Sequence, residues 1–226
     1  MFDKPQVQNE IEAYLLGFIY ADGSVLHKTK HLNKYNAVRL KISKKDKEDL
    51  IRFNKYLNWK YGETKTYIKN KEYDMIYVTN YTINMANQMI ALGVVPRKTY
   101  SNEDFIFTNI PDKFKRHFIR GYFDGNGHIG INKKEQMTFE LCSNNIVFLN
   151  TLLEYLKKYI TTKSKIASGK GVYRIRLGGN KICLKIFHLM YDNHNLDLHL
   201  NRKYEIFKKI EQYNLPKQEY KGEDLK

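Results

Sequence analysis

Two similar segments of the sequence carry a carboxylate and an amide at equivalent positions. AYLLGFIYADGSV (residues 13–25) and HFIRGYFDGNGHI (residues 117–129) resemble each other, and Asp22 in the first aligns with Asn126 in the second (126 − 22 = 104). Each of these two positions is followed by glycine, which is typical of a helix end. A carboxylate is disfavoured at a helix C-terminus because the helix dipole is negative there, and a divalent cation with oxygen ligands would compensate it. Such a cation activates water and stabilises the leaving oxygen in phosphodiester hydrolysis.

Small residues in both segments predict that the two helices pack tightly against each other. Gly17 and Ala21 in the first segment, and Gly121 and Gly125 in the second, are one helical turn apart and share a helix face. Glycine inside a helix costs up to about 1 kcal/mol relative to alanine, so its use at the same spacing in both copies needs a reason. Close approach of two helix backbones supplies that reason, whereas a loose helix does not explain the repeat. Helices packed in this way bring their two ends together.

The stretches that follow the two helices repeat the same order of elements. Strand-like stretches cover 38–43, 64–69 and 74–79 in the first half and 137–143, 162–167 and 172–177 in the second. If a short strand directly after each motif helix is counted as the first, helical stretches lie between the second and third strands, at 47–57 and 145–159, and after the fourth strand, at 83–93 and 182–191. Each half then reaches a basic pair, with Lys98 and Lys203 at matching places (203 − 98 = 105). The sequence therefore predicts an α+β fold of two pseudo-symmetric αββαββα repeats, residues 1–104 and 105–226.

The charge balance indicates a polyanionic partner. Lysine and arginine number 39 against 24 aspartate and glutamate residues, which gives a net charge of +15, divided as +5 over residues 1–104 and +10 over residues 105–226. DNA, RNA and an anionic membrane surface are the candidates. An A/T-rich genome would explain the preference for lysine over arginine, but it does not explain the excess of basic over acidic residues.

The composition also argues against several classes of protein. The longest apolar run, residues 13–21, has nine residues, whereas a membrane helix needs about 20. The N-terminus lacks the basic-then-apolar pattern of a secretory signal. Cys142 and Cys183 cannot form a disulfide scaffold or a zinc site by themselves, and His194 and His199 lack the further ligands of a zinc array. We expect an intracellular, reducing location.

Alternation along the strands predicts sheets with one apolar and one polar, basic face. Val38, Leu40 and Ile42 fall on one face of their strand. The opposite, outward positions are taken by Arg39, Lys41 and Ser43, by Lys65, Tyr67 and Lys69, and by Arg174 and Arg176. A sheet covered on its apolar face can present such a basic face to a polyanion. The alternative is an ordinary solvated face, which would more often mix the two signs of charge.

The segments LLGFIYADG and IRGYFDGNG resemble the LAGLIDADG motif of homing endonucleases. The resemblance extends over nearly the whole chain, which looks like a monomeric, single-chain member with two repeats. It implies that the motif helices form the interface between the repeats and that two saddle-shaped antiparallel sheets straddle double-stranded DNA. It also implies that the helix ends bind a divalent cation, Mg²⁺ or another such as Mn²⁺ or Ca²⁺, and that each DNA strand is cut.

The resemblance assigns roles to individual positions. The metal site would comprise Asp22, Asn126, Ala21 and Gly125, and the basic catalytic residues would be Lys98 and Lys203. The DNA contacts would come from Ser24, Lys28, Lys30, Arg39, Lys41, Lys44, Lys65, Tyr67 and Lys69 in the first repeat, and from His128, Asn132, Thr138, Glu140, Lys163, Lys165, Arg174 and Arg176 in the second. Lysines would mostly hold phosphates, while arginine and the polar side chains would read base edges.

Asn126 departs from the family pattern, which has an acid at this position. Asparagine keeps the size and one oxygen ligand but loses the charge, and Asp124, two residues earlier, points elsewhere on a helix. We therefore expect an inactivated or nicking endonuclease. Asn126 is compatible with an engineered change that holds DNA uncut, with a naturally degenerate or nicking enzyme, and with a protein that only binds. A DNA-binding regulator or an RNA-binding intron maturase is the alternative function. No membrane partner is expected, and the location would be the host cytoplasm, its nucleoid or an organelle.

Overall fold

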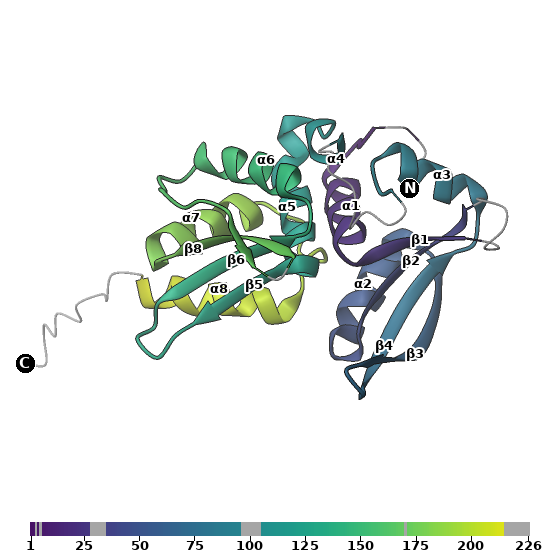
Figure 1. Cartoon of the computed structure of the whole chain (residues 1–226), viewed down its shortest axis with the longest axis horizontal. Coiled ribbons are helices and arrows are strands. Elements are labelled where there is room, and N and C mark those ends of the chain that lie inside the picture. The colour runs from purple at the N-terminus through teal and green to yellow at the C-terminus, as the bar shows by residue number, and fades with distance from the viewer. Residues whose placement is uncertain (3, 5, 28–34, 96–104, 170, 215–226) are drawn as a thin grey trace, which may run out of the picture.

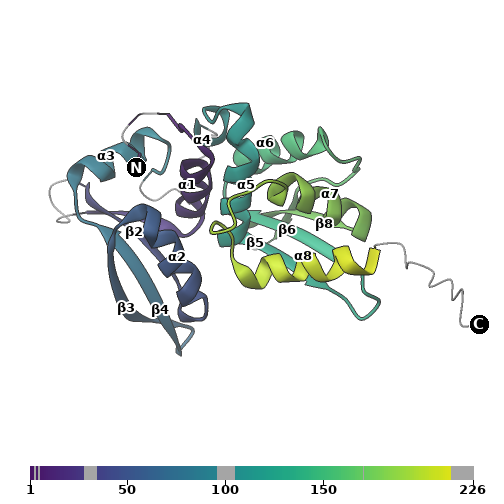
Figure 2. The same ribbon diagram turned by 180° about the vertical axis from the view of Figure 1, so that it is seen from behind.

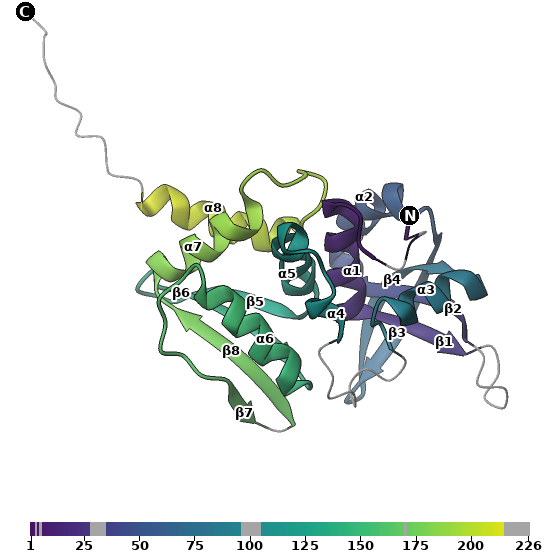
Figure 3. The same ribbon diagram turned by 90° about the horizontal axis from the view of Figure 1, so that it is seen from above.

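Two long helices lie side by side between two β-sheets (Figure 1). The computed structural model describes residues 1–2, 4, 6–27, 35–95, 105–169 and 171–214. The two helices are α1 (Glu10–Asp22) and α5 (Asp112–Asn126), and the view from above also places them between the sheets (Figure 3). All residues of α1 from Glu12 to Ala21 are buried, because α5 lies on one side of this helix and the first sheet and its helices on the other. The fold is α+β, as the sequence predicts.

The first half contains one four-stranded antiparallel sheet with the strand order β1-β2-β4-β3. Its elements after α1 are β1 (Gly23–His27), β2 (Tyr35–Ser43), a short 3₁₀ helix (Lys44–Asp46), α2 (Lys47–Leu57), β3 (Lys60–Ile68), β4 (Lys71–Asn80) and α3 (Ile83–Ala91). The predicted strands and helices of this half are all present, and α2 has the predicted bounds. Seen from behind, α2 lies in front of the sheet (Figure 2).

The second half repeats this topology with the strand order β5-β6-β8-β7. Its elements are β5 (Gly127–Ile131), β6 (Met137–Ser143), α6 (Ile146–Lys157), β7 (Ala167–Gly169), β8 (Val172–Gly178), α7 (Asn180–Tyr191) and α8 (Asn201–Asn214), and the short helix α4 (Phe105–Thr108) precedes α5. The same strand order in both halves agrees with the duplication inferred from the sequence. The boundary predicted at residue 104 lies outside the described residues.

The predicted strand at 162–167 is largely wrong. Only Ala167 in this stretch is in β7, which extends to Gly169 and pairs with β8 over three residues. Residues 161–165 are polar or charged, and the first side chain that packs partly against the core is that of Ile166. Alternation among polar residues does not order an edge strand, because neither face gains apolar contacts.

Local interactions fix where each motif helix begins and ends. The Asn9 side chain caps α1 by accepting a hydrogen bond from the Glu12 amide at 2.9 Å, and the Glu12 carboxylate accepts one from the Gln8 amide at 2.8 Å. At the other end, Gly23 follows Asp22 in an extended conformation, and a Cβ at this glycine would lie 2.5 Å from the Ile19 carbonyl oxygen. The helix therefore ends at Asp22 and β1 begins with the next residue.

Candidate helix-end site and nucleic-acid interface

Glycine lets the backbones of α1 and α5 touch. A Cβ built on Gly17 would lie 2.1 Å from the carbonyl oxygen of Phe118, and one on Gly121 would lie 1.9 Å from that of Tyr14. No real Cβ approaches a backbone oxygen so closely. The two halves therefore meet through their helix backbones, as the repeated small residues predict.

The same close packing continues to the ends of the two helices. A Cβ built on Gly125 would lie 2.3 Å from the Ala21 Cβ and 3.2 Å from Oδ2 of Asp22. The Asp22 carboxylate therefore lies directly against the end of α5, and a side chain at position 125 would fill the space beside it. Ala21 and Asn126 also line one common pocket. The structure thus brings together the four residues predicted to hold a metal.

The donor set at these ends has a single carboxylate. In the part of the chain that the structure describes, three or more His, Cys, Asp or Glu side chains nowhere gather closely enough to hold a metal ion. Asp22 lies against Gly125, and the residue that follows this glycine is an amide, Asn126, in place of a second acid. Mg²⁺ in proteins is commonly held by one or two carboxylates together with substrate phosphates. The residues present therefore fit a cation that is shared with a phosphate, and they do not form a closed protein site.

Asn126 is tied to a tyrosine of its own helix. Its Nδ2 donates to the Tyr122 hydroxyl at 3.4 Å, and that hydroxyl donates to the carbonyl oxygen of Cys142 in β6 at 2.6 Å. Both residues border a pocket of about 330 Å³, which is also lined by Tyr20, Ala21, Cys142, Ser143, Asn144, Asn145 and Val172. None of these described lining residues is charged. Burial raises the pKa of Tyr122, so its hydroxyl stays protonated.

Asp124 is buried away from this pocket. Its Oδ2 accepts hydrogen bonds from the Tyr14 hydroxyl at 2.8 Å and from the Leu200 amide at 2.9 Å. Burial raises the pKa of Asp124 to about 6, and the nearby Lys203 ammonium opposes that shift. The residue joins α5 to α1 and to the segment before α8. It does not replace the missing acid at position 126, as the sequence predicts.

Lys203 fastens the end of α5. Its Nζ is buried and donates to the carbonyl oxygens of Phe123 at 2.5 Å, Asp124 at 2.8 Å and Gly127 at 2.6 Å. A cation is favourable at a helix C-terminus, although burial lowers the pKa of Lys203 to about 8. These three bonds use all the donors of the ammonium group. Lys203 therefore holds the junction between α5 and β5, where Asn126 lies. Its predicted counterpart Lys98 lies outside the described residues.

The open face of the first sheet carries Arg39 and Lys41. Val38, Leu40 and Ile42 are buried on the other face. Arg39 Nε donates to Oγ1 of Thr79 at 3.0 Å, and Lys41 Nζ donates to Oγ1 of Thr66 at 3.1 Å. Cross-strand partners point to the same face of a sheet, and Ser24 of β1 pairs with Arg39. Ser24, Arg39 and Lys41 therefore share the open face, as predicted.

Lys65 and Tyr67 lie on the opposite face, contrary to the predicted arrangement. Lys65 pairs with Asp74 and Tyr67 with Glu72, whereas the open-face Tyr77 pairs with Gly62. The Lys65 ammonium and the Tyr67 hydroxyl both donate hydrogen bonds to the Glu72 carboxylate. The polar residues of β3 alternate without an apolar series, and the sequence therefore does not reveal which set faces outward.

The remaining lysines predicted to contact DNA in the first half lie outside the open face or outside the described residues. Lys44 forms an ion pair with Glu63 at 2.9 Å, on the side of the sheet that α2 covers. Lys69 lies in the β3–β4 turn with φ +49° and is exposed. Lys28 and Lys30 lie outside the described residues.

The open face of the second sheet carries the predicted residues of β5, β6 and β8. Glu140 pairs with His128 on one side and with Arg176 on the other. Arg176 Nε lies 3.0 Å from a Glu140 carboxylate oxygen. Thr138 and Arg174 belong to the same face, because Thr138 pairs with Gly178 and Cys142 pairs with Arg174. This face is hollowed into a pocket of about 190 Å³ lined by His128, Gly130, Ile131, Asn132, Thr138, Glu140 and Arg176.

The remaining predicted contacts of the second half are not in strands. Asn132 organises the β5–β6 turn, where its Oδ1 accepts from the amides of Lys134 and Gln136 at 2.8 and 3.0 Å. Lys163 and Lys165 are exposed in the irregular stretch before β7.

Sequence inspection missed several open-face residues of the first sheet. The β3–β4 register adds Lys60, Thr64, Thr66, Lys71 and Tyr77 to the face that carries Arg39, and it confirms the outward position expected for Tyr73. The sequence did contain a signal for the residues of β4. Ile76 and Val78 are apolar and buried, so the side chains at odd-numbered positions of this strand point to the opposite, open face. The odd residues of β4 thus bring an exposed lysine and two tyrosines to this face.

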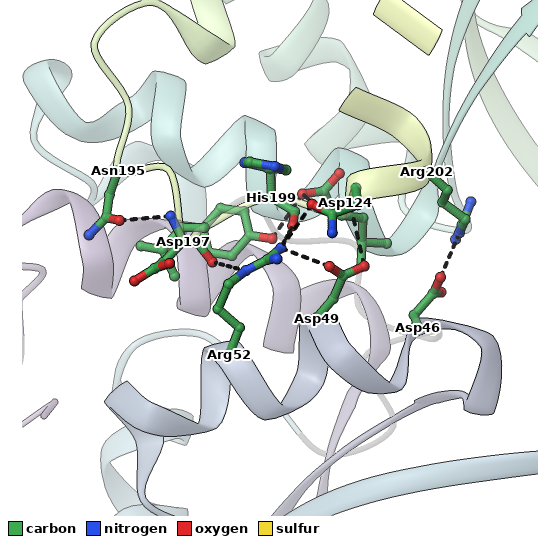
Figure 4. A network of polar contacts seen from close by, with 12 residues as sticks. Asp46, Asp49, Arg52, Asp124, Asn195, Asp197, His199 and Arg202 are labelled. Atoms are coloured by element: carbon green, nitrogen blue, oxygen red, sulfur yellow. Dashed lines mark hydrogen bonds and ion pairs between the residues drawn. The ribbon is translucent and has the colours of Figure 1, made fainter. Parts of the chain in front are cut away.

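A second polar contact joins the halves behind the motif helices (Figure 4). Arg52 of α2 donates to the carbonyl oxygens of Asp197 at 2.9 Å and His199 at 2.6 Å, and it pairs with Asp49 at 2.7 Å. On the same helix, Tyr56 donates to the Asp197 carboxylate at 3.1 Å. The segment before α8 is thereby held against the first half.

Asp46 and Arg202 extend this contact toward the start of α8. Arg202 Nε donates to the Asp46 carboxylate at 2.9 Å, and the Asn201 amide donates to the Asp49 carboxylate at 3.3 Å. Acidic groups at a helix N-terminus are favourable with the helix dipole. The contact therefore helps to hold α8, and with it Lys203, in place.

Three buried histidines lie in the second half. His117 Nδ1 lies 2.8 Å from an Arg120 nitrogen, and His194 Nε2 lies 3.0 Å from Nδ1 of His199. Burial lowers the pKa values of His117 and His199 to about 3, and it also lowers that of His194. The rings are therefore neutral and structural.

Comparisons with known proteins agree with this geometry. Residues 113–190 match the family model of the LAGLIDADG-like domain. A search among curated proteins finds no match. Within the described residues, no helix combines the length and apolar character required to cross a membrane.

Solved structures resemble the whole two-repeat arrangement at low sequence identity. The homing endonuclease I-WcaI bound to its DNA recognition sequence has a TM-score of 0.61 and 12% identity, with 85% of each chain covered. The LAGLIDADG meganuclease I-AabMI bound to uncleaved DNA has a TM-score of 0.55 and 15% identity, with coverage of 91% of this chain and 90% of the other. Full-length DUF199/WhiA from Thermatoga maritima has a TM-score of 0.55 and 18% identity. That match covers 94% of this chain but only 64% of WhiA.

The likeness to these structures concerns the fold, since all three identities are below 20%. The family model matches the second repeat, and the first repeat has the same strand order. Residues 113–190 thus belong to a LAGLIDADG-like domain, and the whole chain has the two-repeat fold of these structures.

Proposed function

We propose that this protein is a site-specific endonuclease that binds a long double-stranded DNA target and cuts one of its strands. The observation that supports the proposal is the asymmetry of the helix ends. Asp22 lies against Gly125 at the end of the interface helices, while the equivalent position of the other half holds Asn126. One half retains the acid for phosphodiester hydrolysis, and the other has lost it.

The open faces on either side of this centre suit a duplex. Arg39 and Lys41 lie on the first sheet, and Arg174 and Arg176 lie on the second. Lysines would neutralise phosphates, whereas the arginines and neighbouring polar groups would read base edges. Two half-sites within one chain allow a monomer to cover a target on the order of 20 bp. A chromosomal or organellar target would place the protein inside the cell.

The helix ends would hold a divalent cation through the Asp22 carboxylate, the Asn126 amide oxygen and the backbone carbonyls of Ala21 and Gly125. Mg²⁺ is the proposed cation, and Mn²⁺ or Ca²⁺ suits similar oxygen ligands. When bound, such a cation supplies an acidified water and stabilisation of the leaving oxygen. Lys203 keeps the end of α5 in place, and Lys98, at the equivalent sequence position, is proposed to act at the end of α1.

The proposal is tested by selecting DNA duplexes that bind the protein and then measuring cutting of a plasmid that carries the selected sequence. Duplexes that bind the protein are enriched from a randomised library in Ca²⁺, and the selected sequence is cloned into a supercoiled plasmid. In Mg²⁺ we expect conversion to relaxed circles with little linear product. Asp22→Asn should retain binding and lose nicking. Nicking that persists in Asp22→Asn, or that occurs equally on plasmids without the selected sequence, would contradict the proposal.

A DNA-binding regulator is the second candidate, because the Asn126 amide has a hydrogen-bond partner and an uncharged pocket around it. This candidate predicts tight, specific duplex binding with intact supercoiled plasmid in Mg²⁺ and Mn²⁺. An RNA-binding intron maturase predicts instead a preference for structured intron RNA over every duplex. Competition between the two nucleic acids at several salt concentrations separates these outcomes.

A further inference from the structure

We propose that Tyr122 is a positioning residue that selects an amide over a carboxylate at position 126. The inference rests on the function proposed above for the helix-end site, and it concerns what keeps the second half from cutting. Restoring aspartate at position 126 would not by itself rebuild that half, because its surroundings are adapted to asparagine.

The hydrogen-bond directions around Tyr122 carry the argument. Tyr122 is 1% exposed, and its single hydroxyl proton goes to the Cys142 carbonyl oxygen at 2.6 Å. The phenolic oxygen therefore acts as an acceptor toward its other partners, Nδ2 of Asn126 at 3.4 Å and the Ser143 side chain. An ionised carboxylate has no proton to donate. At position 126 it would face the tyrosine oxygen, or it would draw the tyrosine proton away from Cys142.

The first half provides an internal comparison. Phe18 occupies the position equivalent to Tyr122, and Asp22 the position equivalent to Asn126, each at the offset of 104 residues. Phe18 is fully buried, and its ring packs at 5.4 Å between centroids against Phe53. It has no hydroxyl that would favour an amide one turn later. Each half thus carries a matched pair, phenylalanine with aspartate and tyrosine with asparagine.

The walls of the pocket beside Asn126 support the same conclusion. Its described lining includes hydroxyl and amide side chains, among them Ser143 and Asn144, but no charged group. A carboxylate at position 126 would therefore find no cation on the described walls of this pocket. The second half has a neutral, amide-compatible environment at the point where the first half presents Asp22.

Four proteins test the inference: the wild type, Asn126→Asp, Tyr122→Phe and the double variant. The first readout is thermal unfolding without DNA or metal. We expect Asn126→Asp to lower Tm by about 2–4 °C when Tyr122 is present, and to have little effect in the Tyr122→Phe background. A control cycle combines Asn126→Asp with Tyr67→Phe, whose hydroxyl lies on the first sheet, and it should be additive.

The second readout is plasmid cutting at the selected target. We expect the double variant to produce linear DNA at least tenfold faster than Asn126→Asp alone. Additive Tm changes, or equal cutting by the two proteins that carry Asn126→Asp, would overturn the role of Tyr122. Coupled Tm changes with no cutting by any variant would support the role of Tyr122 and count against the nuclease function.

Discussion

Gly121 of α5 faces the backbone of Tyr14 in α1, and a Cβ at this glycine would lie 1.9 Å from the Tyr14 carbonyl oxygen. Gly17 makes the reciprocal approach to Phe118. The distance between the halves is thereby set by backbone atoms, which cannot rotate away. Since Asp22 and Asn126 are at the ends of these helices, the helix contact also sets their separation.

Gly121→Ala should weaken the interface between the halves. The added methyl group forces the two backbones apart, and we expect a loss of about 2–4 kcal/mol in the free energy of unfolding. Urea denaturation followed by circular dichroism measures it. Gly178→Ala is the matched control, because a Cβ there meets no atom within 4 Å. Equal stability of the two variants would show that the close approach is not required.

Arg52→Ala should detach the segment before α8 from the first half. Two backbone carbonyls and the Asp49 carboxylate lose their partner, so we expect a loss of about 2–4 kcal/mol in unfolding free energy. Hydrogen exchange should increase in residues 195–203. Lys55→Ala, an exposed position on the same helix, is the control and should leave both measurements unchanged.

Lys41→Ala should weaken binding to duplex DNA more than Lys65→Ala. Lys41 lies on the open face of the first sheet, while Lys65 lies on the other face and is paired with Glu72. Each lost phosphate contact reduces the slope of log affinity against log salt by about 0.9. Fluorescence anisotropy over a range of salt concentrations, on the order of 50 to 200 mM, gives these slopes. A larger effect of Lys65→Ala would mean that the DNA meets the opposite face.

His199 should make the protein less stable in acid. Burial lowers its pKa from 6.5 to about 3, with His194 adding to the effect. Between these values the unfolded chain binds a proton that the folded chain does not, so stability falls as the pH falls from 6.5 toward 3. Between about pH 7 and pH 4.5, we expect the free energy of unfolding to fall by about 1–2 kcal/mol less in His199→Phe than in the wild type.

The comparison must be made at each pH, because other groups titrate in the same range. His117 and His194 act in the same direction as His199, whereas Asp124, whose pKa is raised to about 6, acts in the opposite direction. Arg52 and Arg120 also face His199 electrostatically. His128→Phe, at an exposed site on the second sheet, is the control. An unchanged pH slope in His199→Phe would contradict the prediction.

Much of the fold could be predicted because repetition marks it. Gly17 and Gly121 stand at equivalent positions, and their spacing with Ala21 and Gly125 indicates the helix interface from the sequence alone. The faces of β2, β6 and β8 follow from alternation between apolar and polar residues. In β3 this signal fails, since Lys65 and Thr66 are both polar, and only pairing with β4 decides which of them faces outward.

The surroundings of the site depend on contacts between residues distant in sequence. The sequence shows Asn126, but the role of the Cys142 carbonyl in orienting Tyr122 appears only when β6 lies beside α5. The family resemblance places Lys203 among the catalytic residues, and its three bonds to backbone carbonyls could not be read from a basic pair. The Arg52 contact likewise joins positions 145 residues apart.

The single carboxylate at the helix ends gives the molecule a direction. Asp22 belongs to one half only, and the two open faces carry different side chains, so a duplex lying across them has a distinguishable left and right. Under the proposed function the chain would address the same strand at every encounter with its target. Its product would keep the complementary strand continuous, and that strand would remain available as a template for repair.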